Sequence, residues 1–177
     1  MLTKTLLALS LLTGVIVANH SQSVNAEINE IDSSYVAQLP TADVQTIARD
    51  VTVRVKVEED RGSGILIARD NNTYTVITNA GVTERGDSYT IVTPDGIEHQ
   101  ATLVNSTNKS DLAVLEFSSD KTYSIATIGN SESLTEGEAV IAAGFPEEKN
   151  DVLITNGIIT HVTEKPLNKG YAIGFTV

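Results

Sequence analysis

One candidate for nucleophilic chemistry in this sequence is a serine that stands between two glycines. Ser63 stands between Gly62 and Gly64, as the nucleophilic serine of a hydrolase elbow does. An elbow needs a helix directly after the serine, whereas the apolar segment Gly64–Ala68 is typical of a buried strand. The same two glycines are too few for a loop that cradles phosphate. We therefore expect Ser63 to lie in a strand, without elbow geometry.

The three histidines are candidates because imidazole carries protons and binds metals. His20 is expected to leave with an N-terminal leader. His99 belongs to a predicted strand, Ile97–Val104, and we expect it to be a surface histidine. His161 and Glu164 have His-x-x-E spacing, but three residues along a strand place them on opposite faces. We therefore expect no metal site and no cofactor.

Composition narrows the classes of function further. The chain has no cysteine, which excludes a disulfide scaffold, a thiolate zinc site and a cysteine nucleophile. The formal net charge of -11 argues against nucleic acid and anionic membranes as partners, because both bind clustered Lys and Arg. The acidic turn Glu58–Asp60 has calcium ligands, but we expect it to be a solvated turn.

The N-terminus has the features of a cleavable signal peptide. Lys4 supplies the positive charge, Leu6–Ala18 is an apolar segment too short to span a bilayer comfortably, and small residues precede a cleavage site after Ala26. We expect export to the periplasm or the medium, with 27–40 as a flexible arm of the mature chain. The alternative is an uncleaved membrane anchor.

The elements that must position these residues are mostly strands. A short helix is expected over Thr41–Asp50, where apolar residues recur every three to four positions. Six short strands bounded by turn residues then favour an antiparallel barrel or sandwich, over a first domain of residues 41–129. The six are Val51–Val57, Gly64–Ala68, Thr73–Thr78, Ser88–Thr93, Ile97–Val104 and Leu112–Phe117.

A second set of strands makes a smaller unit, residues 130–177. Its expected strands are Ala139–Ala143, Val152–Val162 and Tyr171–Val177. Three strands cannot close a barrel, so unpaired edges and an apolar face should remain open to a peptide or protein partner. The candidate residues of that face are Ile154, Ile158, Val162, Ile173, Phe175 and Val177.

Three motifs follow one another in the chain: Gly62–Ile67, Thr78–Val82 and Ser110–Leu115. In this order they resemble the trypsin-like, chymotrypsin-fold serine proteases of the bacterial exported type, and the resemblance covers residues 41–177. It implies an all-β double barrel, with the first barrel complete and the second about half present. It also implies that the second motif carries the catalytic histidine and that Asp111 holds the triad aspartate position.

Two departures from the family pattern bear on activity. Gly81 occupies the histidine position, and the nucleophile motif Gly-x-Ser-Gly-Gly does not occur in the 177 residues. Glycine cannot take a proton from a serine, so we expect no peptidase activity. Asp111 should then have a structural role, capping the loop 108–110 or meeting water.

Three interpretations follow from those departures. The chain is an inactive protease homologue, that is, a pseudoprotease or the remnant of a protease truncated before its nucleophile motif. Alternatively, it is a non-catalytic module that binds peptides or proteins along open strand edges. In the third, it is half of a split serine protease, but the missing histidine counts against that interpretation.

Overall fold

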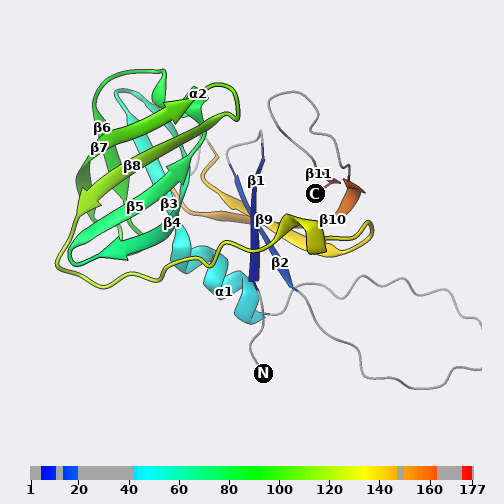
Figure 1. Ribbon diagram of the computed structural model, residues 1–177. Helices are drawn as coiled ribbons and strands as arrows, with labels where there is room; N and C mark the ends of the chain where they lie inside the picture. The colour runs from blue at the N-terminus through cyan, green and yellow to red at the C-terminus, as the bar shows by residue number, and fades with distance from the viewer. Residues whose placement is uncertain (1–4, 11–13, 20–41, 147–149, 163–172, 177) are drawn as a thin grey trace, which may run out of the picture.

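The structure is a computed structural model that describes residues 5–10, 14–19, 42–146, 150–162 and 173–176. A closed barrel of six strands stands beside an open sheet of five strands, which confirms the expected mostly β fold (Figure 1). The expected arm 27–40, the cleavage site after Ala26 and Thr41, the first residue of the expected helix, lie outside the described residues.

The barrel closes in the order β3-β4-β5-β8-β7-β6, with every neighbouring pair antiparallel. Its strands are β3 (Thr52–Val57), β4 (Asp60–Asp70), β5 (Thr73–Thr78), β6 (Tyr89–Val92), β7 (Glu98–Thr107) and β8 (Leu112–Ser118). The six strands expected from the sequence are therefore confirmed, with ends shifted by a few residues. Closure leaves none of these strands with a free edge.

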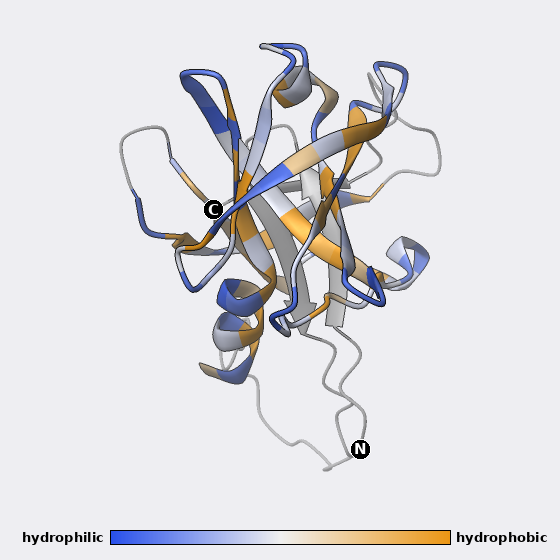
Figure 2. Cartoon of the chain, turned by 90° about the vertical axis from the view of Figure 1, so that its left-hand side faces the viewer, coloured by the Kyte–Doolittle hydropathy of each residue, from blue (hydrophilic) through white to orange (hydrophobic). Residues whose placement is uncertain are grey.

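Alternation along the strands builds the barrel core. In β3, Val53, Val55 and Val57 are fully buried, whereas Arg54 and Lys56 between them are only half-buried. These valines pack with inward residues of the other strands, among them Leu66 and Leu115. Apolar stretches lie within the strands and hydrophilic residues in the connecting turns (Figure 2).

Helix α1 (Ala42–Val51) leads directly into β3, close to the expected bounds. It buries Val44, Ala48 and Val51 at helical spacing. These residues pack with Ile65 of β4 and with residues of the second sheet, so α1 lies where the barrel and the sheet meet (Figure 1).

The second sheet has the order β1-β2-β9-β10-β11 and does not close. Its strands are β1 (Thr5–Ser10), β2 (Gly14–Asn19), β9 (Ala139–Gly144), β10 (Leu153–Val162) and β11 (Ile173–Thr176). We expected three strands here; the two further strands come from the segment expected to be the leader. A short apolar strand gains backbone hydrogen bonds at a sheet edge, which the sequence pattern does not reveal.

Two short helical elements also differ from expectation. The segment after β5, for which we expected no helix, contains α2 (Ala80–Thr83), and a 3-10 turn, η1 (Ser131–Ser133), precedes β9. Both are too short to produce a helical repeat of apolar residues.

The expected apolar face of β10 is only partly correct. Ile154 packs against the α1 cluster, and Ile158 is 38% exposed. The buried residue is Ile159, which is 1% exposed and was not expected in the interior. The register of β10 against β11 shifts between Ile159 and His161, and such an irregularity changes which residues share a face.

Candidate functional site

Strand pairing brings the second and third motifs together. β5 ends at Thr78, which lies opposite Ala113 near the start of β8. The residues that follow β5 therefore lie beside Asp111, which directly precedes β8. This places Gly81, on the exposed side of α2, next to the aspartate expected to hold the triad position.

Asp111 is held in this position by contacts to both ends of the segment after β5. The Asn79 side-chain amide lies 3.3 Å from carboxylate Oδ2 and 3.4 Å from the Asp111 carbonyl oxygen, and donates to both. The backbone N–H of Gly81 donates to Oδ1 over 3.3 Å. Asp111 is 7% exposed and has a positive φ of 51°, an uncommon backbone geometry for a residue with a side chain. The carboxylate thus organises the segment 79–81, a partner that we did not expect from the sequence.

Position 81 has room for a side chain. A Cβ built on Gly81 would meet, among the described residues, a single atom within 4 Å: Asp111 Oδ1, at 3.9 Å. The first atom of any side chain at 81 would therefore already lie beside the carboxylate. With glycine present, this position offers Asp111 a backbone N–H and no group that can accept a proton.

Ser63 lies in β4, as expected, and no helix follows it. It is 3% exposed, and its Oγ accepts a hydrogen bond of 2.8 Å from the backbone N–H of Phe145. Its carbonyl oxygen accepts from the Thr78 hydroxyl at 2.8 Å. Phe145 directly follows β9, so Ser63 links the barrel to the second sheet.

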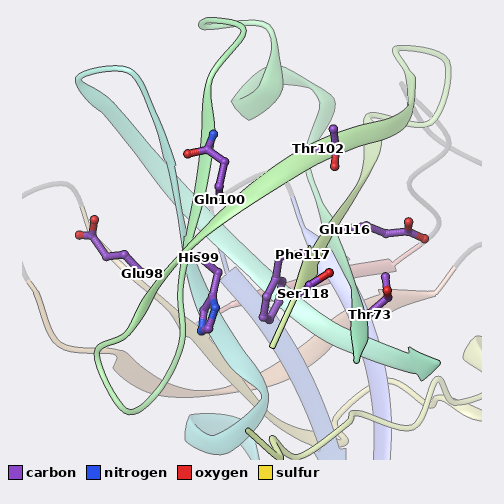
Figure 3. Close-up of a pocket in the computed structure, with 8 residues that line it drawn as sticks. All are labelled: Thr73, Glu98, His99, Gln100, Thr102, Glu116, Phe117 and Ser118. Carbon is purple, nitrogen blue, oxygen red and sulfur yellow. The ribbon is translucent and has the colours of Figure 1, made fainter. Parts of the chain in front are cut away.

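His99 is not the surface histidine that we expected. It is half-buried at one end of the barrel, where its ring lies 4.8 Å from that of Phe117 and 5.9 Å from that of Tyr123, centre to centre. Figure 3 shows the His99 and Phe117 rings side by side, while Glu98 and Gln100 point away from them. No residue pattern near His99 indicates this contact, because the contact depends on the pairing of β7 with β8.

A polar network continues from His99. Its Nε2 lies 3.2 Å from the Tyr123 hydroxyl and 3.4 Å from Thr93 Oγ1, and Thr93 donates to Asp95 over 2.6 Å. Burial by itself raises the pKa of Asp95, but hydrogen bonds from Thr93, Lys121 and the Ile97 amide outweigh it and lower the pKa to about 2. The network closes the turn after β6, and within it the Thr93 hydroxyl donates to Asp95.

The remaining metal candidates do not assemble within the described part of the chain. His161 Nδ1 lies 3.6 Å from Glu136, and Glu164 lies outside the described residues. Asp60 of the acidic turn faces Arg85 at 3.9 Å. Among the described residues, no group of three His, Cys, Asp or Glu is placed to hold a metal ion.

Comparison with known proteins decides the family. Residues 62–176 match the family described as a trypsin-like peptidase domain. The chain belongs to this family. It is 39% identical to the serine protease Do-like HtrA of Bacillus subtilis (strain 168) over 106 residues. These aligned residues make up 59% of this chain and 24% of that protein. It is 38% identical over 101 residues to a probable periplasmic serine endoprotease, DegP-like, of Halomonas elongata, covering 57% of this chain and 20% of that protein.

The fold of this trypsin-like chain resembles solved structures of the same type. The HtrA-type protease AlgW with tripeptide superposes with a TM-score of 0.64 at 26% identity, over 80% of this chain and 45% of AlgW. A serine endoprotease from Yersinia pestis gives a TM-score of 0.58 at 23% identity, over 83% of this chain and 54% of that one. The chain thus spans about a quarter or less of the two curated relatives named above and about half of these structures.

None of the helices that the structure describes has the length and apolar character needed to cross a membrane.

Proposed function

We propose that this chain is an exported, catalytically inactive member of the trypsin-like family. The observation that carries the proposal is Gly81. It stands in the segment Thr78–Val82, whose resemblance to the family motif assigns position 81 to the catalytic histidine, and it lies against Asp111 as that assignment requires.

The chemistry of the triad explains why this single position is decisive. The imidazole takes the proton of the serine hydroxyl and later returns it to the leaving amine. At position 81 the chain offers only a backbone N–H, and Asp111 accepts it. The other described histidines, His99 and His161, have partners of their own away from Asp111.

A peptidase assay tests this proposal. The purified protein should release no product from casein or from a fluorogenic peptide library above the rate of a buffer blank. The HtrA protease of Bacillus subtilis, purified in the same way, is the positive control. Turnover that co-purifies with this chain through two orthogonal columns would refute the proposal.

Export is part of the same proposal. It rests on the leader pattern around Lys4 and Leu6–Ala18, and on relatives whose names place them in the periplasm. The intact mass of exported protein should correspond to a chain that begins at Glu27. A mass that begins at Met1 would favour the uncleaved anchor instead.

A non-catalytic role in binding is the second candidate. It is favoured by the open five-stranded sheet, because sheets with accessible edges take up extended peptides by strand addition. A bound peptide recovered with the purified chain would support this role. The split-protease interpretation requires instead that a second chain restore turnover, and Gly81 counts against that outcome.

A further inference from the structure

β9 is an inner strand of the second sheet because it has a partner on each side. β10 pairs with it over Ala139–Gly144. On the other side β2 pairs with it antiparallel, with Val15 opposite Ala143 and Ala18 opposite Val140. β2 belongs to the segment proposed to be the cleaved leader. Among the described residues, only β2 pairs with this side of β9, so removal of the leader would leave it as a sheet edge within this part of the chain.

The place that β2 occupies adjoins an apolar cluster. β2 lies next to α1 and β4 as well as β9. One cluster of buried residues joins α1, β4 and β9, and it includes Ala48, Ile65 and Ile141. A strand at this position therefore gains backbone hydrogen bonds from β9 and borders a hydrophobic layer.

We propose that this edge of β9 is a strand-acceptor site, filled by Gly14–Asn19 in the full chain. After the leader is removed, the site binds an extended, apolar segment of another polypeptide, antiparallel to β9. The inference rests on the proposed export and the proposed non-catalytic role, and it names the partner's chemistry. We call the segment Gly14–Asn19 of the intact chain the plug.

The register sets the sequence preference of the site. Ile141 and Ala143 both belong to the cluster on the α1 face of the sheet. Residues directly opposite each other in an antiparallel pair share a face, so the partner's residues opposite Ile141 and Ala143 must be apolar. In the chain's own plug, Val17 and Val15 hold these register positions. The position opposite Ala142 belongs to the other face, where Ala142 is only half-buried although Val140 is buried, so the requirement for an apolar residue is less strict there.

The plug can be tested in the intact chain, which has no cysteine of its own. Ile16 and Ala142 are cross-strand partners, so Ile16→Cys with Ala142→Cys should form a disulfide under mild oxidation. The matched control is Val17→Cys with Ala142→Cys, which lies one residue out of register, and we expect it to cross-link far less. Equal cross-linking of the two pairs would overturn the pairing on which the proposal rests.

The acceptor is tested by exchange of the plug. A site for a sequence-specific protease is inserted between residues 20 and 41, and the full chain is cut after it has folded. A dye-labelled peptide of residues 13–20 should then bind saturably to the cut chain, as measured by fluorescence polarisation. The uncut chain should bind the peptide with an affinity at least about tenfold lower. The oxidised Ile16→Cys, Ala142→Cys chain should not bind the peptide after cutting, because the disulfide holds the plug in place. It should bind the peptide once the disulfide is reduced.

Two variants of the peptide separate strand addition from non-specific adhesion. Val17→Asp should weaken binding about tenfold or more, because it places a charge at the position opposite Ile141. Ile16→Asp, opposite the half-buried Ala142, should weaken binding less than Val17→Asp does. Equal weakening by both substitutions would overturn the proposed register.

The remaining outcomes are also decisive. The proposed acceptor site would be overturned if the cut chain releases the plug and keeps its circular dichroism spectrum but does not bind the labelled peptide. Unfolding on release of the plug, without rescue by the peptide, would overturn it as well, because such a site cannot be refilled. Failure of the acceptor site and failure of the proposed function give different results. Mass spectrometry of the labelled peptide after incubation separates them: a cleaved peptide would show that the chain is catalytic, whether or not the peptide binds.

Discussion

Replacing Gly81 with histidine tests the central feature of the site, the juxtaposition of position 81 and Asp111. The new Cβ would lie 3.9 Å from Asp111 Oδ1 and, apart from its own helix and chain neighbours, would meet no other described atom within 4 Å. The ring nitrogens lie two or three bonds from Cβ. A rotamer turned toward Asp111 brings one of them within about 4 Å of this largely buried carboxylate.

The expected magnitude follows from this separation. Two unit charges about 4 Å apart attract each other by about 4 kcal/mol at an effective dielectric constant of about 20. Position 81 is exposed, so solvent screening reduces this to about 1.4 kcal/mol, which corresponds to about one pKa unit. We therefore expect the pKa of the new imidazole to rise from about 6.5 to about 7.5.

NMR titration of the imidazole Cε1 proton measures this pKa directly, with Gly81→His, Asp111→Asn as the control. A raised pKa means that the folded state binds the proton more tightly. The extra stability is therefore fully present below about pH 6.5 and is lost as the pH rises through about 7.5. Urea unfolding of Gly81→His at pH 5.5 and pH 8.5 should show this loss, and the double variant should not. An imidazole pKa at or below 6.5 in Gly81→His would refute the proposed geometry.

Three further predictions concern stability. Gly81→Ala should stabilise the chain by about 0.5–1 kcal/mol, since alanine is the better helix former and the new Cβ has space. Gly64→Ala should destabilise the chain by about 1–3 kcal/mol, because the new Cβ would come within 2.6 Å of a neighbouring valine methyl. Thermal unfolding compares the two, and equal effects would contradict this account of the packing. Ser63→Ala should cost about 1–3 kcal/mol, because it leaves the buried N–H of Phe145 without its acceptor, and a change in urea midpoint below a few tenths of a molar would argue against it. The pKa of Asp95 is lowered to about 2 from a usual 3.8, so its carboxylate adds stability that is present above about pH 4 and lost as the pH falls toward 2. Because the side chain is exposed, we discount this contribution to about 1 kcal/mol. Asp95→Asn should remove that part of the acid-induced loss, measured by urea titrations at pH 5 and pH 2.5.

Local patterns in the sequence were enough to predict the barrel strands. The alternation of Val53, Val55 and Val57 with charged residues indicates a strand with one buried face, and the structure buries all three. The turn residues between strands limited each strand to within a few residues of its observed ends. Helix α1 was predictable for a similar reason, because its buried residues recur at helical spacing.

Contacts between distant residues were not predictable in the same way. The hydrogen bond from Phe145 to Ser63 joins residues 82 positions apart, and neither residue carries a local sign of the other. The place of His99 among aromatic rings depends on the pairing of β7 with β8. The pairing of β2 with β9 joins segments far apart in the chain, and an apolar segment of six residues looks the same whether it is a leader or a strand.

The sequence by itself therefore determined the family, the strand content and the identity of the two residues at the site, Gly81 and Asp111. Only the tertiary structure decided that these two face each other at hydrogen-bonding distance, that Ser63 is buried in a link between the two sheets, and that β9 has a second partner. The physical reason is the range of the forces involved. Side-chain periodicity acts over a few neighbouring residues, whereas a site is built by strand register and burial, which join residues far apart in the chain.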